Sequence, residues 1–234
     1  DVLNAQQYAT YANELQANGG QPPIPALQNP SELRDVTDWQ EELFQTAPIQ
    51  DHNVNFSGGS ENARYLFSAG YYGQEGIVRN SGFERVSFRA NSDFNIGKRI
   101  EVGESFLISN TNTYGVNQGI FTERALTNAV LMPTYISVYD PTEIGGFNGT
   151  DVADGTDADN PIKITDLFDR EQRRLSILGN AYLNYEIIEG LSYRFSASVD
   201  YTTGRNYFFR PRYTAGERDV NPFSFLDESF VNGN

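Results

Sequence analysis

The stretch from Val54 to Ile108 reads VNFSGGSENARYLFSAGYYGQEGIVRNSGFERVSFRANSDFNIGKRIEVGESFLI. Apolar and polar residues alternate along it in successive runs, and short polar turns separate the runs. Because successive side chains of a β-strand point to opposite faces, this alternation predicts a sheet with one apolar face and one polar face. The clearest run is 86–96, where Ser92 is the one polar member of a side that otherwise holds Val86, Phe88, Ala90, Phe94 and Ile96.

The alternation returns in two later segments, 175–187, where Leu178 is the exception, and 191–201, which has none. Each segment is at least as long as the roughly 9 to 11 residues that a tilted strand needs to cross a bilayer, whereas soluble strands usually have about 5 to 6. A soluble sandwich shows the same alternation, so the length and the repetition of the runs must distinguish it from a transmembrane barrel. They favour an all-β protein, an antiparallel transmembrane β-barrel with long extracellular loops.

The composition agrees with a barrel. The chain has 234 residues, no cysteine, one histidine and 13% aromatic residues, and its mean hydropathy is −0.51. Barrels with a polar interior have a mean hydropathy near that of soluble proteins, and no segment approaches the ~20 consecutive apolar residues of a transmembrane helix. The net charge of −14 argues against a nucleic-acid partner, whose phosphates would be repelled.

The lengths of the connections orient the predicted strands, which we expect near 52–58, 63–75, 82–95, 99–113, 172–188 and 191–209. Three connections are tight hairpin turns and one is very long, and barrels have short periplasmic turns and long extracellular loops. The expected organisation is an extracellular loop with a short helix at 1–50, four barrel strands at 51–113, a long extracellular loop at 114–170, two barrel strands at 171–210 and the start of the next extracellular loop at 211–234. Six strands leave exposed sheet edges that lipid does not tolerate, so we expect part of a larger barrel.

Several short motifs follow one another in an order that resembles the SusC/RagA family of TonB-linked outer-membrane transporters. They are TDWQ at 37–40, TAPIQ at 46–50, GG at 58–59, YLFSAGYY at 65–72, QEGIV at 74–78, FER at 83–85, FRAN at 88–91, VGE at 102–104, LTNAVLMPTYISVYD at 126–140, NP at 160–161 and GL at 190–191. Each motif is weak alone, but the ordered set covers nearly the whole chain. The family's plug domain and TonB box have no counterpart in this sequence.

The resemblance implies about six strands of a barrel of the roughly 22-strand type, integral to the outer membrane and its lipid in a Gram-negative bacterium. The function it implies is import of oligosaccharides or peptides with a SusD-like surface lipoprotein, powered by the TonB–ExbB–ExbD complex through the parts that have no counterpart here. No cofactor is implied. Two alternatives stay open: a small passive barrel or porin, and a soluble extracellular β-sandwich that acts as a binding module.

An enzyme is not expected. With His52 as the only histidine and no cysteine, the sequence lacks the usual zinc ligands, and it lacks a base for an activated nucleophile. The acidic turn at 148–159 offers carboxylate oxygens to a calcium ion, with Asp151, Asp154, Asp157 and Asp159 as weak candidates. It lacks the spacing of an EF-hand loop, so we expect a solvated loop and no metal site.

Alternation also selects the side chains that would face the barrel lumen, where they would bind substrate or contact the plug. These candidates are Arg64, Arg85, Arg89, Asn91, Tyr182, Asn184, Arg194 and Asp200. Glu104 breaks the scheme, because strict alternation aims it at lipid. We therefore expect a β-bulge or an interfacial position at Glu104.

Two predicted helices belong to the loops. One carries Trp39 and is capped by Thr37 or Asp38, and the other covers 119–132, before Pro133. Either helix packs on the protein itself or contributes to the surface that meets the lipoprotein. The candidates for that contact are Trp39, Phe121, Leu126, Tyr135 and Tyr139.

Overall fold

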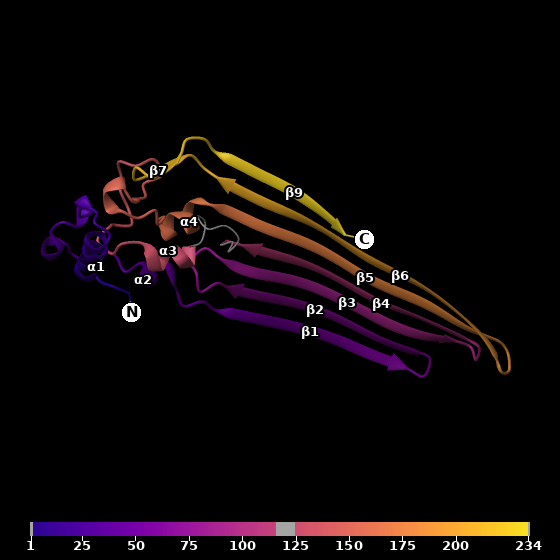
Figure 1. Cartoon of the computed structure of the whole chain (residues 1–234). Coiled ribbons are helices and arrows are strands. Elements are labelled where there is room, and N and C mark those ends of the chain that lie inside the picture. Colours follow the sequence, from indigo (N-terminus) through magenta and orange to yellow (C-terminus); the bar gives the residue numbers. More distant parts are fainter. Residues whose placement is uncertain (1, 116–124, 234) are drawn as a thin grey trace.

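The computed structural model describes residues 2–115 and 125–233. Seven strands form one antiparallel sheet in the order β1-β2-β3-β4-β5-β6-β9. The strands are β1 (Ile49–Ser60), β2 (Ala63–Glu75), β3 (Gly82–Ile96), β4 (Ile100–Tyr114), β5 (Asp169–Ile188), β6 (Leu191–Arg210) and β9 (Phe225–Gly233). The helices and long loops all lie at one end of the sheet, the loop end, and the tight turns lie at the other, the turn end (Figure 1).

The six predicted strands are present, each within three residues of its expected bounds. β9 was not predicted, and the assignment of 211–234 to a loop was wrong for this part. The stretch FLDESFVNG alternates poorly, because Asp227 and Glu228 are adjacent. It is held as a strand by pairing with β6, from Arg210↔Phe225 to Thr202↔Gly233.

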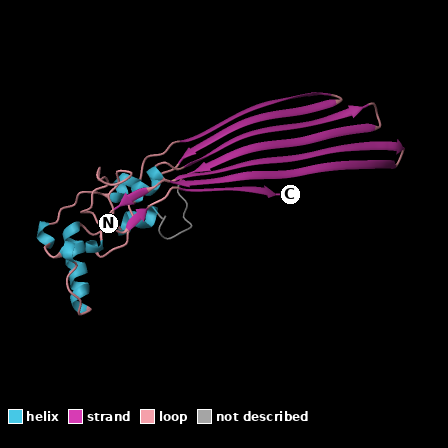
Figure 2. Ribbon diagram, turned by 90° about the horizontal axis from the view of Figure 1, so that it is seen from above, coloured by secondary structure: helices cyan, strands magenta, loops and turns pink. Residues whose placement is uncertain are grey.

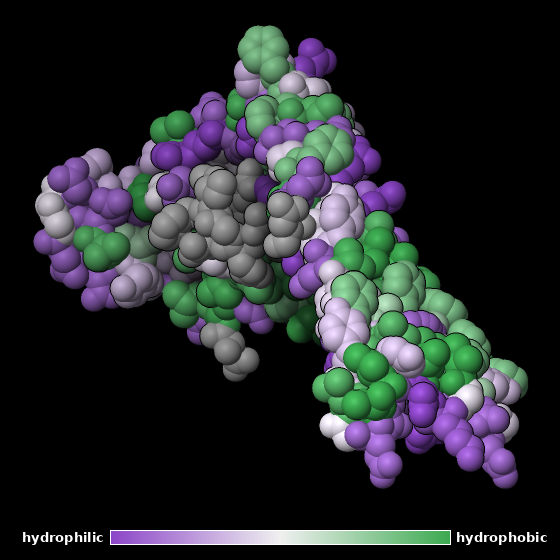
Figure 3. All heavy atoms as spheres, turned by 90° about the vertical axis from the view of Figure 1, so that its right-hand side faces the viewer, coloured by the Kyte–Doolittle hydropathy of each residue, from purple (hydrophilic) through white to green (hydrophobic). Residues whose placement is uncertain are grey.

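The cross-strand register gathers the apolar residues on one face of the sheet. Phe88 pairs with Ile108, Ile108 with Ile177, and Ile177 with Tyr201, so these four side chains form a row across β3 to β6. Figure 3 shows hydrophobic residues gathered over the strands, with hydrophilic residues at the tips of the turns. No other sheet and no helix of the described residues covers this face (Figure 2), whereas a soluble sandwich would cover it with a second sheet.

Glu104 lies on the apolar face without a β-bulge, so that alternative was wrong, and the interfacial position of Glu104 stays a prediction. The register runs without a break from Ser92↔Glu104 to Glu104↔Ala181. Apolar Val102 and Phe106 flank Glu104 along its face of β4. Ser92 Oγ donates a hydrogen bond to Glu104 Oε1 at 2.8 Å, and this bond is what satisfies the carboxyl group.

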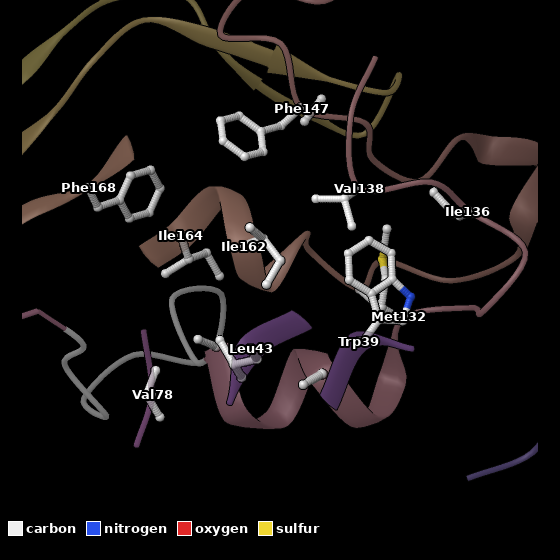
Figure 4. Packing of buried hydrophobic residues seen from close by; sticks show 14 of the residues in the cluster. Trp39, Leu43, Val78, Met132, Ile136, Val138, Phe147, Ile162, Ile164 and Phe168 are labelled. Atoms are coloured by element: carbon white, nitrogen blue, oxygen red, sulfur yellow. The ribbon is translucent and has the colours of Figure 1, made fainter. Parts of the chain in front are cut away.

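The remaining elements form a folded unit at the loop end, which we call the loop body. It contains α1 (Ala5–Asn18), η1 (Pro25–Leu27), η2 (Pro30–Glu32), α2 (Trp39–Leu43), α3 (Ala125–Leu131), η4 (Val152–Asp154), α4 (Pro161–Leu167) and a hairpin of β7 (Tyr213–Ala215) and β8 (Asp219–Asn221). Its core packs side chains from α2, α3, α4 and the intervening loops around Trp39, Met132 and Ile162 (Figure 4). None of the helices in residues 2–115 and 125–233 is long and apolar enough to cross a bilayer.

The helix α1 was not predicted, although local signals for it exist. Asn4 and Gln7 form a capping box, in which the Asn4 side chain accepts from the Gln7 backbone and the Gln7 side chain accepts from the Asn4 backbone. The buried side of α1 consists of small residues, Ala5, Ala9 and Ala12. Alanine is a weak hydrophobic signal, so the stripe does not stand out in the sequence.

Candidate transport surface on the polar face

All eight predicted lumen residues lie on the polar face. Arg85 pairs with Thr111, Arg89 with Leu107 and Asn91 with Ser105, and none of these pairs shares a face with the row of Phe88. The cross-strand register also places the other five candidates on the polar face: Arg64, Tyr182, Asn184, Arg194 and Asp200. Asn91 also accepts a hydrogen bond from Ser105 Oγ at 2.9 Å.

Three of these residues meet near the turn end in one polar network. The Tyr182 hydroxyl donates to Asp93 Oδ1 at 2.7 Å and lies 3.2 Å from Glu101 Oε1, and Asn184 Nδ2 donates to Glu101 Oε2 at 2.8 Å. The Arg194 guanidinium lies 4.5 Å from the centre of the Tyr182 ring. Asp93 and Glu101 were missed as candidates, although alternation assigned Asp93 to the polar side.

A second group on the same face lies near the loop end. The Arg85 guanidinium lies 5.6 Å from the centre of the Tyr72 ring, and the rings of Tyr72 and Phe83 are 5.9 Å apart. The Tyr72 hydroxyl donates to Gln74 Oε1 at 2.9 Å. Sequence reasoning chose Arg85 but not its two aromatic neighbours. The structure thus distributes the predicted residues over the length of the face and does not gather them in one site.

The partner-loop candidates have different exposures. Trp39 is 2% exposed and its Nε1 donates to the Pro133 carbonyl at 3.0 Å, so it is a core residue and its assignment to a partner surface was wrong. Leu126 and Tyr135 are partly buried against the two clusters of the loop body. Tyr139 is 54% exposed, and its ring packs against the Phe147 ring at a tilt of 44°, with 5.3 Å between the ring centres. Phe121, with residues 119–124 of the predicted helix, lies outside the described residues.

Three of the four aspartates proposed as weak calcium ligands have other partners, and Asp151 is one of them, since its Oδ1 accepts from the Glu217 backbone N–H at 2.8 Å. Asp154 accepts from the Asp151 backbone and from the Tyr135 hydroxyl, and it is 7% exposed. Asp159 forms an ion pair with Lys163. Within residues 2–115 and 125–233 there is no group of three or more His, Cys, Asp or Glu side chains that could hold a metal ion.

Sequence reasoning also missed a buried cation in the loop body. The Lys163 side chain is 0% exposed, lies 2.5 Å from Asp159 Oδ1, pairs with Asp219 and faces the Tyr213 ring at 4.1 Å. Burial lowers the pKa of Lys163, although Asp159 opposes this, and burial raises the pKa of Asp159. Lys163 ties α4 to the β7–β8 hairpin, two elements that are far apart in the sequence.

A scan against protein-family models found no match. Among known proteins, the chain is similar to the TonB-dependent receptor P3 of Formosa agariphila, with 31% identity over 202 residues, which is 83% of this chain and 18% of the relative. It is also similar to the TonB-dependent receptor SusC of Bacteroides thetaiotaomicron, with 26% identity over 96% of this chain and 24% of the relative. The chain therefore spans about a fifth of the length of these curated relatives.

Among solved structures, the RagAB peptide importer in its open-open state superposes with a TM-score of 0.64 and 24% identity, over 97% of this chain and 26% of that one. At this identity the likeness concerns the fold. These relatives are named as receptors or importers, and none is named as an enzyme. The sequence matches, the antiparallel sheet and the superposition agree, and the chain belongs to the SusC/RagA family of TonB-dependent receptors, as part of the transmembrane β-barrel.

Proposed function

We propose that this chain forms part of the barrel wall of a TonB-dependent importer that takes up oligosaccharides or peptides across the outer membrane of a Gram-negative bacterium. One observation carries the proposal. The sheet has a continuous apolar face that no described residue covers and an opposite face lined with arginine, asparagine, tyrosine and acidic residues. Such a sheet suits a wall between lipid and a polar passage.

In this proposal the eight lumen residues and their neighbours serve the passage. Guanidinium and amide groups donate hydrogen bonds to substrate or to the plug domain, and aromatic rings offer flat surfaces for stacking. The Asp93–Tyr182–Glu101 network lies near the turn end, on the periplasmic side in this orientation. The loop body would then face outward, where Tyr139 is an exposed candidate for contact with a SusD-like lipoprotein. Coupling to TonB–ExbB–ExbD would use parts of the receptor beyond this chain.

The two alternatives fit the observations less well. The relatives are named as TonB-dependent receptors or as an importer, and none of those reported above is named as a passive pore. A soluble binding module would expose the apolar row of Phe88, Ile108 and Ile177 to water. An importer agrees with the names of the relatives and places this apolar row against lipid.

Uptake by cells tests the proposal against both alternatives. Cells that carry the natural receptor, with or without functional TonB, are given labelled oligosaccharides and labelled peptides. The importer requires both the receptor and TonB for uptake of at least one label. Uptake that needs the receptor but not TonB would indicate a passive pore. Uptake that needs neither would contradict the proposal that the receptor transports these molecules.

The polar face is tested in the same assay by Arg89→Ala and Asp200→Ala. Arg34→Ala, at an exposed arginine of the loop body, is the matched control. Both lumen variants should lower the initial uptake rate about tenfold while the amount of receptor in the outer membrane stays constant, since a lost charge-assisted hydrogen bond is worth about 1.5 to 3 kcal/mol. Unchanged rates in both would show that these residues do not serve the passage.

A further inference from the structure

The apolar face of the sheet carries its arginines at one place. Arg173 on β5 and Arg205 on β6 are the only arginines on this face of the seven described strands, and none of those strands places a lysine there. The two arginines pair with each other in the register, so their side chains stand next to each other across the two strands. Both lie toward the loop end of the sheet (Figure 1), which is the outward end in the proposed orientation.

The residues around the arginine pair follow one another in layers along the strands. Two residues toward the turn end, Leu175 follows Arg173 on the same face, and beyond it begins the apolar row that β5 shares with β3, β4 and β6. Two residues toward the loop end lie Glu171 and Glu228, which both pair with Tyr207. In a barrel wall the apolar layer contacts acyl chains and the next layer outward contacts lipid headgroups. The arginine pair therefore lies at the level of the headgroups.

Each arginine has a carboxylate of its own on the outward side. Arg173 Nη2 donates to Glu171 Oε1 at 2.7 Å, and Arg205 Nε lies 2.8 Å from Glu228 Oε1. A guanidinium has five N–H donors, and each of these contacts engages one nitrogen. No carboxylate of the described residues pairs with both guanidiniums. The group of four is neutral, so its selectivity for a ligand would come from the geometry of the arginine pair.

A phosphate group suits the space between the two arginines. Like charges directly opposite each other destabilise a sheet, and an anion that contacts both reduces that cost. A phosphate has several acceptor oxygens, so it can accept hydrogen bonds from both guanidiniums at once. The two side chains remain 57% and 41% exposed, and the Arg205 guanidinium is also held 5.4 Å from the centre of the Tyr207 ring.

Apolar side chains next to the pair favour a lipid over a free anion. Phe230 on β9 pairs with Arg205 and is 69% exposed. Leu175 lies on the other side of the pair, on the way to the apolar row. The acyl chains of a lipid would bury these surfaces, whereas inorganic phosphate would leave them uncovered. Basic side chains beside a membrane-facing surface commonly recognise anionic lipid headgroups.

We propose that Arg173 and Arg205 together bind the phosphate group of an outer-leaflet lipid, whose acyl chains lie on the apolar face of β5, β6 and β9. The site would fix the depth at which this part of the wall sits in the membrane. The inference goes beyond the import proposal, because it involves the face opposite the passage and no transported substrate. It requires that the sheet is a barrel wall with its loop end outward.

Native mass spectrometry of the full-length natural receptor, stripped of lipid in detergent, tests the proposal. The probes are lipid A and lipid A from which the phosphates have been removed, and inorganic phosphate is the competitor. Arg173→Gln/Arg205→Gln removes both charges, and Arg173→Lys/Arg205→Lys keeps the charges without the planar fork. Arg34→Gln/Arg174→Gln is the matched control, since it removes one exposed arginine of the loop body and one on the polar face. The heat-dependent shift on a denaturing gel checks that each variant is folded.

We expect the wild type to bind lipid A about tenfold or more tightly than its phosphate-free form. The glutamine variant should lose this preference, the lysine variant should keep only part of it, and the control should stay within about twofold of the wild type. Equal binding of the two lipids by the wild type, or a full preference in either the glutamine or the lysine variant, would overturn the proposal. An equal loss in the control would overturn it too.

Inorganic phosphate distinguishes a lipid from a free anion. An equimolar amount should leave lipid A bound, since the free anion lacks the acyl chains. Displacement of lipid A by it would overturn the assignment to a lipid. TonB-dependent uptake is a separate measurement, so the loss of a phosphate preference would leave the import proposal standing.

Discussion

Lys163 is the residue whose removal should damage the loop body most. Its ammonium group is fully buried between Asp159 and Asp219, so replacing it leaves two carboxylates without their cation. Removing one partner of a buried ion pair costs about 3 to 5 kcal/mol. We therefore predict that Lys163→Met unfolds α4 and the β7–β8 hairpin locally, with faster hydrogen exchange there in the full-length receptor. Lys98→Met, at the only other lysine and in the exposed β3–β4 turn, is the control. Equal exchange in the two variants would contradict the prediction.

Tyr135 gives the loop body a predictable dependence on high pH. Burial raises the pKa of Tyr135, and the Asp154 carboxylate, which accepts its hydroxyl at 2.9 Å, raises this pKa further. As pH rises, the unfolded chain therefore loses the phenolic proton of Tyr135 before the folded loop body does, from about pH 10. The contribution of Tyr135 to the stability of the loop body is complete below that pH and declines as the pH rises above it. Tyr135→Phe should reduce this decline, and Tyr8, whose pKa burial also raises, accounts for the part that remains. The lost hydrogen bond costs about 1 kcal/mol at neutral pH.

The rate of cleavage of the loop body by subtilisin between pH 8 and pH 11 measures this effect. In the wild type, cleavage relative to an unstructured reference peptide should accelerate above about pH 10. Tyr139→Phe, at an exposed tyrosine of the same body, should keep the wild-type profile. A Tyr135→Phe profile with the same acceleration would show that another group causes it.

At the scale of elements, the pair of Ser92 and Glu104 joins β3 to β4 in the middle of an apolar run. A carboxyl group facing lipid is costly, and the Ser92 hydroxyl reduces that cost. Ser92→Ala should lower the unfolding free energy of the barrel in lipid vesicles by about 1 to 2 kcal/mol, since Glu104 then lacks its donor. The double variant Ser92→Ala/Glu104→Leu removes both polar groups and should be at least as stable as the wild type. Urea titration in vesicles measures both, and a double variant weaker than the single one would contradict the argument.

The elements differ in how far the sequence predicts them. Strand alternation is a local signal, so β1 to β6 and the polar placement of Arg89 or Asp200 follow from it. The network of Asp93, Tyr182 and Glu101 depends on pairing between residues that are 81 and 89 positions apart, which no local pattern encodes. The same holds for the hydrogen bond from Gln172 to Asn206 on the polar face, because these two residues are 34 positions apart. The sequence therefore predicts which face a side chain occupies, but not which partners it finds there.

Two separate environments meet in the whole molecule. The sheet buries few side chains, because its apolar face suits contact with lipid and its polar face suits contact with water. The loop body, by contrast, has a packed hydrophobic core of its own. The loop body and the sheet therefore draw their stability from different sources: apolar burial within the protein for the first, and backbone pairing with lipid contact for the second. A substitution such as Lys163→Met should thus leave the barrel strands folded.

Adjacent residues of one strand provide the most direct test of this two-environment arrangement. Val199 lies on the apolar face of β6 and is 49% exposed, and Ser198 lies on the polar face. Because this chain has no cysteine, a cysteine introduced at either position can carry a bimane label once any cysteines elsewhere in the natural receptor are replaced. In reconstituted vesicles, nitroxide-bearing lipids should quench the label at Val199→Cys, and aqueous iodide should quench the label at Ser198→Cys. A one-residue step reverses the face of a strand, so the two quenchers should exchange their effects between these neighbours. Iodide quenching at both positions would show that the apolar face is in water. It would contradict the assignment of the sheet to a barrel wall, on which the transport proposal depends.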